Sequence, residues 1–428
     1  MNTMNEFTGA AQGLIGQLVQ EDFSGAYKLF DGKLAQALPE DRLKETWHQI
    51  LSQFGAFQSI LNLQEVEIQG HQNITATCQF ENTVLDIRIM FNPDGQVGGL
   101  NVQLGASNTP YQPPAYVNMA AFQEVELTVG SGDWALPATL SLPNGMGPFP
   151  SVVLVHGSGP QDRDETIGPN KVFRDLAWGL ASQGIAVLRY EKRTKAHAAR
   201  YTPEMIARIT TQDEVIDDAL AAVQLLRRTP GIDPQRIYVL GHSLGATLAP
   251  RIGQQDPGIT GLIALAGITR TFEDTILDQF TYLANLSGTP SELQKADLEQ
   301  LKEKVARVKD PNLSLQTQAE DLPLGIHPAY WLDLRGYQPA ELAKSLDMPI
   351  FVLQGGRDYQ VTAADDFPAW QKALAHKSNA TLKLYPKLYH LFIEGEGPST
   401  PQEYYKEGHV STEVIQDIAG WIKGQPGK

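Results

Sequence analysis

Residues 237–250, IYVLGHSLGATLAP, constrain the fold more than any other stretch of this chain. Four apolar or aromatic residues lead into the pentapeptide GHSLG, and small residues suited to the start of a helix follow it. The G-x-S-x-G pattern is typical of a strained turn between a strand and a helix, where flanking glycines permit close approach of the backbone. This context predicts that Ser243 is a nucleophile, and an ordinary turn serine is the alternative.

From residue 122 onward, apolar strand-like runs alternate with longer helical segments. This alternation is typical of an α/β fold, a mostly parallel sheet flanked by helices. About eighty residues separate the fourth run from the fifth, which is too long for a loop. Their helical period and charge pairing predict a helical cap at about residues 270–345. The predicted strands are SVVLVHG, IAVLRY, RIYVLGH, GLIALAG, PIFVLQGG and TLKLYP.

The cap contains an aromatic segment, HPAYWLDLRGY, at residues 327–337. Aromatic side chains are common in the walls of ligand-binding clefts, so this segment is a candidate to face one. The alternative is that Tyr330 and Trp331 only pack the cap onto the body of the domain.

The first 105 residues have a different pattern. Residues 6–54 carry helical spacing in two stretches, which predicts two helices. Four alternating runs follow, with the turn NPDG before the last, and they predict an antiparallel meander. We therefore expect a small α+β domain at residues 1–105, a Pro- and Asn-rich linker at 106–121, and the α/β domain with its cap at 122–428.

Composition narrows the possible partners. The formal net charge of −15 argues against nucleic acid and anionic membrane surfaces, because both require clustered Lys and Arg. The single cysteine, Cys78, excludes an internal disulfide and a thiolate cluster for a metal. No run approaches the roughly 18 apolar residues of a membrane span, and the first residues lack the pattern of a signal peptide. The cytoplasm is therefore the expected compartment, unless an export signal has been removed.

A serine nucleophile requires a base, and the late histidines are the candidates. His390 follows the strand-like run ATLKLY, so it is expected at the same sheet edge as the serine turn. His409 precedes the final amphipathic helix and is more simply interpreted as part of the approach to that helix. We predict that His390 is the base.

The base requires an acid that orients it, and Asp358 follows the run PIFVLQGG at the expected edge. The alternative for Asp358 is a turn aspartate that bonds to its own backbone. Asp365 and Asp366 come later, in what is expected to be the start of a helix. We predict that Asp358 is the acid.

The reaction also requires hydrogen-bond donors for the oxyanion. The Gly-rich loop HGSG at residues 156–159 follows the first strong strand, and it predicts one donor at the backbone of Ser158. The second is expected at Leu244, the residue after the nucleophile. His156 and His242, beside these motifs, are predicted to be hydrogen-bonded neighbours and not acid–base groups.

These motifs, in the order His-Gly loop, serine turn, Asp358 and His390, resemble an α/β-hydrolase. Within that superfamily, LVHGSGPQDRDE, LRYEKR, GHSLG and YHLF are similar to a group of bacterial serine esterases, a likeness over roughly residues 122–428. Related sequences often place glycine after Lys-Arg, whereas Thr194 and Lys195 follow Arg193 here. Residues 1–105 resemble a small domain of unknown role that precedes some bacterial hydrolases. This likeness implies an accessory role, at the active-site mouth or in dimerisation.

The prediction is a serine hydrolase that cleaves small-molecule carboxylic esters of short to medium acyl chain through an acyl-enzyme. No metal or organic cofactor is required by such a reaction. The alternatives are a peptidase or acyltransferase with the same triad, a binding protein that has lost catalysis, and a binding protein that acts through its N-terminal domain. The sequence does not predict the substrate-binding residues or the oligomeric state, and a dimer is one option.

Overall fold

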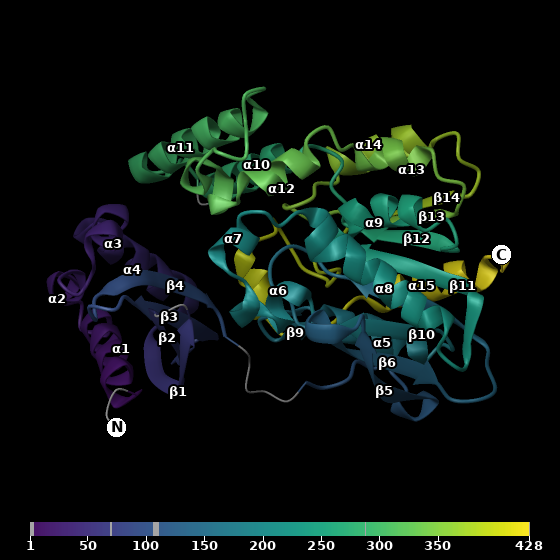
Figure 1. The fold of residues 1–428 in the computed structure, drawn as a ribbon, viewed down its shortest axis with the longest axis horizontal. Helices are drawn as coiled ribbons and strands as arrows, with labels where there is room; N and C mark the ends of the chain where they lie inside the picture. The colour runs from purple at the N-terminus through teal and green to yellow at the C-terminus, as the bar shows by residue number, and fades with distance from the viewer. Residues whose placement is uncertain (1–3, 69–70, 106–110, 287, 428) are drawn as a thin grey trace. The chain divides into compact units, whose positions relative to one another are not determined.

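A computed structural model describes residues 4–68, 71–105, 111–286 and 288–427 of the chain (Figure 1). The chain divides into two compact units. Unit 1 comprises Met1–Tyr111, Ile167–Asn170 and Tyr404–Glu407, and unit 2 comprises the rest. Part of the predicted linker, residues 106–110, lies outside the described residues. No helix in the described ranges is both long and apolar enough to cross a bilayer.

Unit 1 begins with four helices, of which two are long. The predicted pair corresponds to α1 (Met4–Val19) and α4 (Glu40–Phe54). Two short helices that were not predicted, α2 (Phe23–Tyr27) and α3 (Gly32–Ala37), lie between them. Each short helix follows an aspartate whose side chain accepts a hydrogen bond from a backbone N–H of its first turn, which is the usual N-cap signal.

The sheet of unit 1 is the predicted antiparallel meander, with strand order β1-β2-β3-β4. Alternate residues of β2 are buried, so one face of the sheet covers the core. Leucines and Trp47 from α1 and α4 belong to the same core as that face. The strands are β1 (Phe57–Ile68), β2 (His71–Phe80), β3 (Val84–Phe91) and β4 (Val97–Leu104).

Unit 2 is built on an eight-stranded sheet with the order β14-β13-β12-β11-β7-β10-β6-β5. The six predicted strands are present and mutually parallel, which confirms the α/β fold. Two further strands, β5 and β6, pair antiparallel at one edge. The strands of this sheet are β5 (Phe122–Val129), β6 (Leu136–Pro143), β7 (Phe149–Val155), β10 (Ala186–Tyr190), β11 (Ile232–His242), β12 (Gly261–Leu265), β13 (Ile350–Gly355) and β14 (Ala380–Tyr385). The short strands β8 (Thr166–Ile167) and β9 (Asn170–Lys171) form a separate two-stranded sheet.

Helices flank this sheet. The helices α8 (Asp217–Arg227) and α9 (Leu244–Gln255) pack against β11, and α14 (Asp366–Leu374) adds Trp370 to the same core. The helix α5 (Val172–Ala181) packs against β10 and against α15 (Thr412–Gly424). Two short helices, α6 (Arg193–Ala196) and α7 (Pro203–Ile206), lie between β10 and α8.

The long insertion between β12 and β13 is helical, as predicted. The helices α10 and α11 pack together (Figure 1). With Trp331 of α12 they form a small core of their own. The helix α13 contacts α9 and α14, so it joins the insertion to the body of unit 2. The bounds are α10 (Phe272–Asn285), α11 (Glu292–Lys309), α12 (Pro328–Leu334) and α13 (Pro339–Lys344).

Candidate active site

Ser243 occupies the sharp turn between β11 and α9. Its backbone has φ 52° and ψ −114°, a strained combination for a residue with a Cβ. The flanking glycines make the turn sterically possible. A Cβ at Gly241 would lie 2.2 Å from the carbonyl carbon of Gly245, and a Cβ at Gly245 would lie 2.1 Å from the carbonyl oxygen of Val155. The turn therefore has the strained geometry that the pentapeptide predicts.

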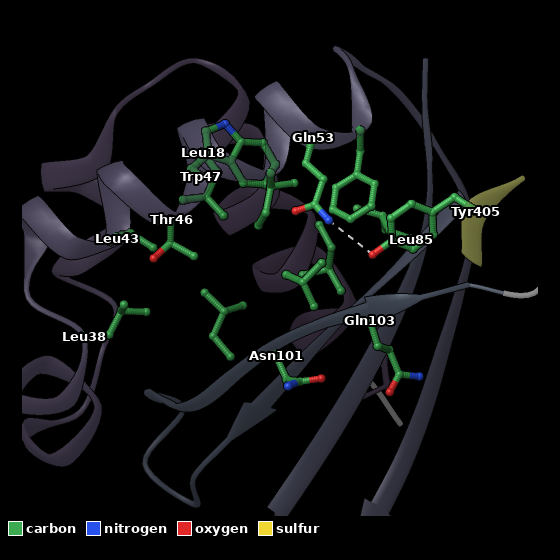
Figure 2. Close-up of a pocket in the computed structure, with 15 residues that line it drawn as sticks. Leu18, Leu38, Leu43, Thr46, Trp47, Gln53, Leu85, Asn101, Gln103 and Tyr405 are labelled. Carbon is green, nitrogen blue, oxygen red and sulfur yellow. Dashed lines mark hydrogen bonds between the residues drawn. The ribbon is translucent and has the colours of Figure 1, made fainter. Parts of the chain in front are cut away.

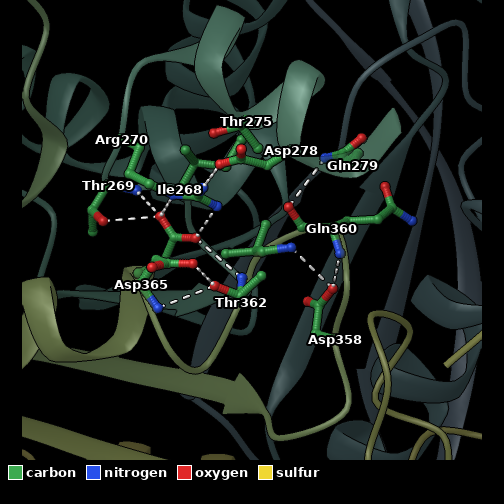
Figure 3. A network of polar contacts seen from close by, with 12 residues as sticks. Ile268, Thr269, Arg270, Thr275, Asp278, Gln279, Asp358, Gln360, Thr362 and Asp365 are labelled. Carbon is green, nitrogen blue, oxygen red and sulfur yellow. Dashed lines mark hydrogen bonds and ion pairs between the residues drawn. The ribbon is translucent and has the colours of Figure 1, made fainter. Parts of the chain in front are cut away.

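Asp358 and His390 form a buried pair. Asp358 follows β13, and its Oδ1 accepts hydrogen bonds from the backbone N–H groups of Gln360 and Val361 at 2.8 and 3.0 Å (Figure 3). Its Oδ2 lies 2.7 Å from Nδ1 of His390, which follows β14. Both residues are 4% exposed. The two backbone bonds fix the carboxylate, and the carboxylate fixes the imidazole.

His242, the residue before Ser243, connects the serine turn to His390. The His242 ring lies 4.8 Å from the His390 ring, centroid to centroid, and its Nε2 donates a hydrogen bond to the His390 carbonyl at 2.9 Å. Among the described side chains, no hydrogen bond joins Ser243 Oγ to His390. Such bonds often tighten only when substrate binds, so the arrangement remains compatible with a serine–histidine pair.

The two backbone groups predicted as oxyanion donors lie in the loop after β7 and at the first residue of α9. Leu244 begins α9, so its N–H has no acceptor within the helix. Ser158 lines a pocket of about 660 Å³ in unit 2, and the preceding Gly157 lies against Ser243, since a Cβ there would be 3.3 Å from Ser243 Cβ. Gly157 N–H donates to Glu165 at 2.7 Å, which leaves Ser158 as the next donor of this loop.

The alternative acid and base residues have other partners. His409 Nδ1 lies 3.1 Å from Asp175 of α5. Asp366 is fully buried and accepts hydrogen bonds from Thr269 and Thr362, so it joins the loops after β12 and β13. Asp365 bonds only to Thr362 in this network.

A second imidazole–carboxylate pair lies beside the first. Glu165, 1% exposed and with φ 48°, places Oε2 2.9 Å from His242 Nδ1. Burial alone would raise the pKa of Glu165, but the neighbouring His242 charge holds that pKa below its ordinary value. Burial alone would lower the pKa of His242, and Glu165 raises it above its ordinary value. His242 has a hydrogen-bond partner, as the sequence predicts, in the His390 carbonyl.

His156, the other histidine beside a motif, also has a hydrogen-bond partner. Its Nε2 lies 3.0 Å from the carbonyl oxygen of Asp162, which confirms the predicted hydrogen bond. Burial lowers the pKa of His156 to about 4. Glu165 was not among the predicted residues. Its only signal in the sequence is its position at the end of the Gly-rich loop motif GSGPQDRDE.

Unit 2 contains a pocket of about 660 Å³ that Ser158 and the insertion both line. Tyr330 of α12 borders this pocket, whereas Trp331 packs inside the insertion and donates to the Ile326 carbonyl. The expectation that the segment faces a cleft therefore holds for Tyr330, whereas Trp331 packs within the core of the insertion and not onto the body of the domain. The other lining residues are mostly apolar or aromatic and include Tyr201, Ile206, Ile209, Phe272, Leu324 and Ile326.

The segment at which the sequence departs from its relatives forms the short helix α6. Arg193 makes two hydrogen bonds with Asp218 of α8, at 2.7 and 2.6 Å, which hold the start of α6. Thr194 lines the 660 Å³ pocket, so the departure lies at the wall of that pocket.

Unit 1 has a pocket of about 380 Å³ between α4 and the sheet (Figure 2). Apolar and aromatic residues such as Leu43 and Trp47 form most of its wall, and the polar groups Thr46, Asn101 and Gln103 border it. Gln53 Nε2 donates to the Tyr405 hydroxyl at 3.4 Å. Within the described ranges, no group of three or more His, Cys, Asp and Glu side chains is placed to hold a metal ion.

Comparison with protein families gives two matches. The family model described as serine aminopeptidase, S33, matches residues 148–396. A second, described as a protein of unknown function (DUF3887), matches residues 11–100.

Three known proteins illustrate the similarity. Esterase EstD of Thermotoga maritima is 38% identical over 410 residues, which are 95% of this chain and 93% of that protein. Esterase FrsA of Klebsiella pneumoniae is 25% identical over 161 residues, 38% of this chain and 35% of FrsA. The solved structure of Est1E from Butyrivibrio proteoclasticus has 15% identity and a TM-score of 0.44, covering 70% of this chain and 99% of that one.

Proposed function

The chain belongs to the serine aminopeptidase S33 family of α/β-hydrolases, and on that premise we propose that it hydrolyses carboxylic esters through Ser243. The observation that carries the proposal is the Asp358–His390 pair beside the strained turn at Ser243. The 38% identity with an esterase across 95% of the chain supports an ester as the substrate.

In the proposed reaction, Ser243 Oγ attacks the ester carbonyl carbon while His390 Nε2 takes its proton. Asp358 keeps the Nδ1–H of His390 in place and stabilises the imidazolium. The N–H groups of Ser158 and Leu244 bind the oxyanion of the tetrahedral intermediate. His390 then protonates the leaving alcohol, and an acyl-Ser243 forms. Water, deprotonated by the same histidine, releases the acid and restores the serine.

The 660 Å³ pocket supports an uncharged substrate of short to medium length. Its volume lies in the range of roughly 300–1,000 Å³ that small-molecule sites occupy. Among the described residues that line it, Glu214 alone is acidic. Glu214 already pairs with Lys192 at 2.8 Å and accepts a hydrogen bond from Tyr330, so it is not available to bind the free ammonium of a peptide substrate. This favours esters over aminopeptidase substrates.

The test is hydrolysis of a series of chromogenic esters of two to twelve acyl carbons, with matched anilides and aminoacyl anilides. We expect turnover of the esters, a maximum at short to medium chains, and loss of activity in Ser243→Ala. Leu384→Ala, an exposed change on β14, serves as the control. Faster cleavage of the aminoacyl anilides would overturn the ester proposal, and activity that persists in Ser243→Ala would overturn the mechanism.

A separate proposal concerns the domain boundaries and the role of the N-terminal part. We propose that residues 1–105 and 122–428 are separate domains joined by a linker, residues 106–121. Limited proteolysis of the full chain is expected to cut first within 106–121.

The 380 Å³ pocket supports a second candidate function, binding of a small uncharged molecule by the N-terminal domain. A thermal-shift screen on the full chain, with Leu43→Trp to fill the pocket, tests it.

The oligomeric state and the compartment stay predictions. A dimer that forms through the N-terminal domain is expected to dissociate when residues 1–105 are removed, which light scattering measures. Cell fractionation tests the cytoplasmic location.

A further inference from the structure

Two buried charged side chains form hydrogen bonds with the peptide groups on either side of Gly157. Gly157 N–H donates to Glu165 Oε1 at 2.7 Å, and the Gly157 carbonyl accepts from Lys192 Nζ at 2.9 Å. Lys192 is 2% exposed and Glu165 is 1% exposed. Neither residue has a part in the proton transfers of the proposed reaction. Both nevertheless hold the loop that leads into Ser158.

Each of the two charged side chains has a counter-ion. Glu165 pairs with His242 at 2.9 Å, and Lys192 pairs with Glu214 at 2.8 Å. We call the four residues Glu165, His242, Lys192 and Glu214 the Gly157 clamp. Each carboxylate of the clamp therefore faces a basic group. This pairing matters here because an unpaired buried charge is very costly.

The two ends of the clamp reach other parts of the site. His242 Nε2 donates to the carbonyl of His390. At the opposite end, Glu214 accepts a hydrogen bond from the Tyr330 hydroxyl of α12 at 2.8 Å. Glu214 itself lies in a π-helical turn, Gln212–Ile216, before α8, a type of turn that is frequent at functional sites. One chain of buried polar contacts thus runs from the insertion, through the Gly157 loop, to the backbone of the base.

Peptide planarity gives the Lys192 contact a specific consequence. The carbonyl of Gly157 and the N–H of Ser158 belong to one planar trans peptide group, so they point in opposite directions. By fixing the carbonyl, Lys192 also fixes the direction of the Ser158 N–H. A cation on the carbonyl oxygen further polarises the peptide, which makes the N–H a stronger donor.

We propose that Lys192 and Glu165 are positioning residues that aim the Ser158 N–H at the oxyanion, and that Lys192 also strengthens this donor. The inference rests on the proposed ester hydrolysis, since it assigns a role within the same reaction. The purely structural alternative is that Lys192 and Glu165 only stabilise the loop. The positioning role predicts a specific loss of transition-state stabilisation, because an aimed donor stabilises the oxyanion more than it stabilises the bound ester. The structural role predicts no such difference.

The test is Lys192→Met, which keeps most of the side-chain length and removes the charge and the donor. Removing an oxyanion donor outright costs about 10²–10³-fold in kcat, so mis-aiming one is expected to cost about 10–100-fold, with KM changed less than threefold. Lys192→Arg is expected to recover part of this loss. The control is Lys195→Met, an exposed lysine on α6, which is expected to retain the native kcat.

A trifluoromethyl ketone separates the two roles. Ser243 Oγ adds to its carbonyl carbon, His390 takes the proton, and the ketone oxygen becomes an oxyanion in the same position as in the intermediate. We expect the inhibition constant of this ketone to rise by the same factor as kcat/KM falls. The inhibition constant of the product carboxylic acid is expected to change less than threefold. Equal weakening of both inhibitors would indicate a structural role and overturn the inference.

Folding and function are controlled separately. Where Lys192→Met does not fold by circular dichroism, Lys192→Gln, which keeps an N–H donor without a charge, is measured with the same pair of inhibitors. A folded variant with kcat within twofold of the native value overturns the inference alone, provided that Ser243→Ala is inactive. A native protein that cleaves no ester, or an active Ser243→Ala, overturns the proposed function and this inference together.

Discussion

Two buried pairs of an imidazole and a carboxylate lie side by side in unit 2, and they differ at the second ring nitrogen. In the Asp358–His390 pair, Nδ1 contacts the carboxylate at 2.7 Å, and no described residue bonds to Nε2. In the Glu165–His242 pair, Nδ1 contacts the carboxylate at 2.9 Å, and Nε2 donates to the His390 carbonyl. All four residues are buried.

The difference shows how one arrangement of groups serves two purposes. An imidazole with one vacant nitrogen can accept a proton and return it. His242 faces a carboxylate and a carbonyl oxygen, both of which are acceptors, and the carboxylate of Glu165 raises the pKa of the His242 ring. The first pair is therefore suited to proton transfer, and the second is suited to position backbone groups. Four predictions test this division.

The largest effect is expected for His390→Gln. The variant keeps a polar side chain of similar size but has no group that can act as a base, so kcat is expected to fall about 10⁴–10⁶-fold with little change in KM. Initial rates with a chromogenic ester measure it. His409→Gln is the matched control and is expected to retain the native rate. Loss of activity in His409→Gln with retention in His390→Gln would reverse the assignment of the base.

A smaller effect is expected for Asp358→Asn. The amide no longer selects the tautomer of His390 that leaves Nε2 free to accept a proton, so kcat is expected to fall about 10⁴-fold at neutral pH. Glu165→Gln, the same change in the other pair, is expected to cost only about tenfold, since its side chain positions a donor and moves no proton. Comparable losses in the two variants would contradict the division between the pairs.

The third prediction concerns stability. His242→Gln leaves the Glu165 carboxylate buried and unpaired, which is expected to lower the free energy of unfolding by about 3–5 kcal/mol. Glu165→Gln leaves the His242 cation unpaired, with a similar expected cost. The stability loss of the double variant is expected to be smaller than the sum of the losses of the two single variants, by about 2 kcal/mol. Urea unfolding of the four proteins measures this coupling, and additive costs would show that the two groups do not form a pair.

The sequence predicts the proton-transfer pair better than the fixed pair, for a physical reason. Ser243, Asp358 and His390 each follow a predicted parallel strand, and the carboxyl ends of parallel strands meet at one edge of the sheet. Strand order and spacing are therefore enough to nominate them. The structure brings Asp358 and His390 together, and the roles of the three residues remain predictions until the variants are measured.

Glu165 and Lys192 follow no such rule. Glu165 reaches the site because the loop after β7 turns back at Glu165, where φ is positive. Lys192 reaches the site because the chain forms the short helix α6 directly after Lys192. Both depend on loop geometry that has no sequence period. The strands β5 and β6 were not predicted either, because they form an antiparallel edge outside the parallel pattern. The short helices α2 and α3 were missed because each has too few residues to show a helical period.

The smallest expected effect is the pH dependence of the fixed pair. The raised pKa of His242 means that its contribution to stability is complete below pH 6.5 and is lost as pH rises through the folded-state pKa. The lowered pKa of Glu165 means that its contribution is complete above pH 4.5 and is lost as pH falls through the folded-state pKa. The pair therefore contributes fully between about pH 4.5 and 6.5, a window in which burial keeps His156, with its pKa of about 4, mostly neutral.

Urea unfolding at pH 5.5 and pH 9 measures this dependence. Because the pKa of His242 is raised in the folded state, we expect the native protein to lose stability at the higher pH relative to the double variant Glu165→Gln, His242→Gln. Asp358, Lys192 and His390 face the pair in both proteins, so their titration cancels in the comparison to first order. Equal pH dependence in the two proteins would mean that His242 does not change its charge in this range, and a gain of stability at pH 9 would mean that it is neutral in the native fold.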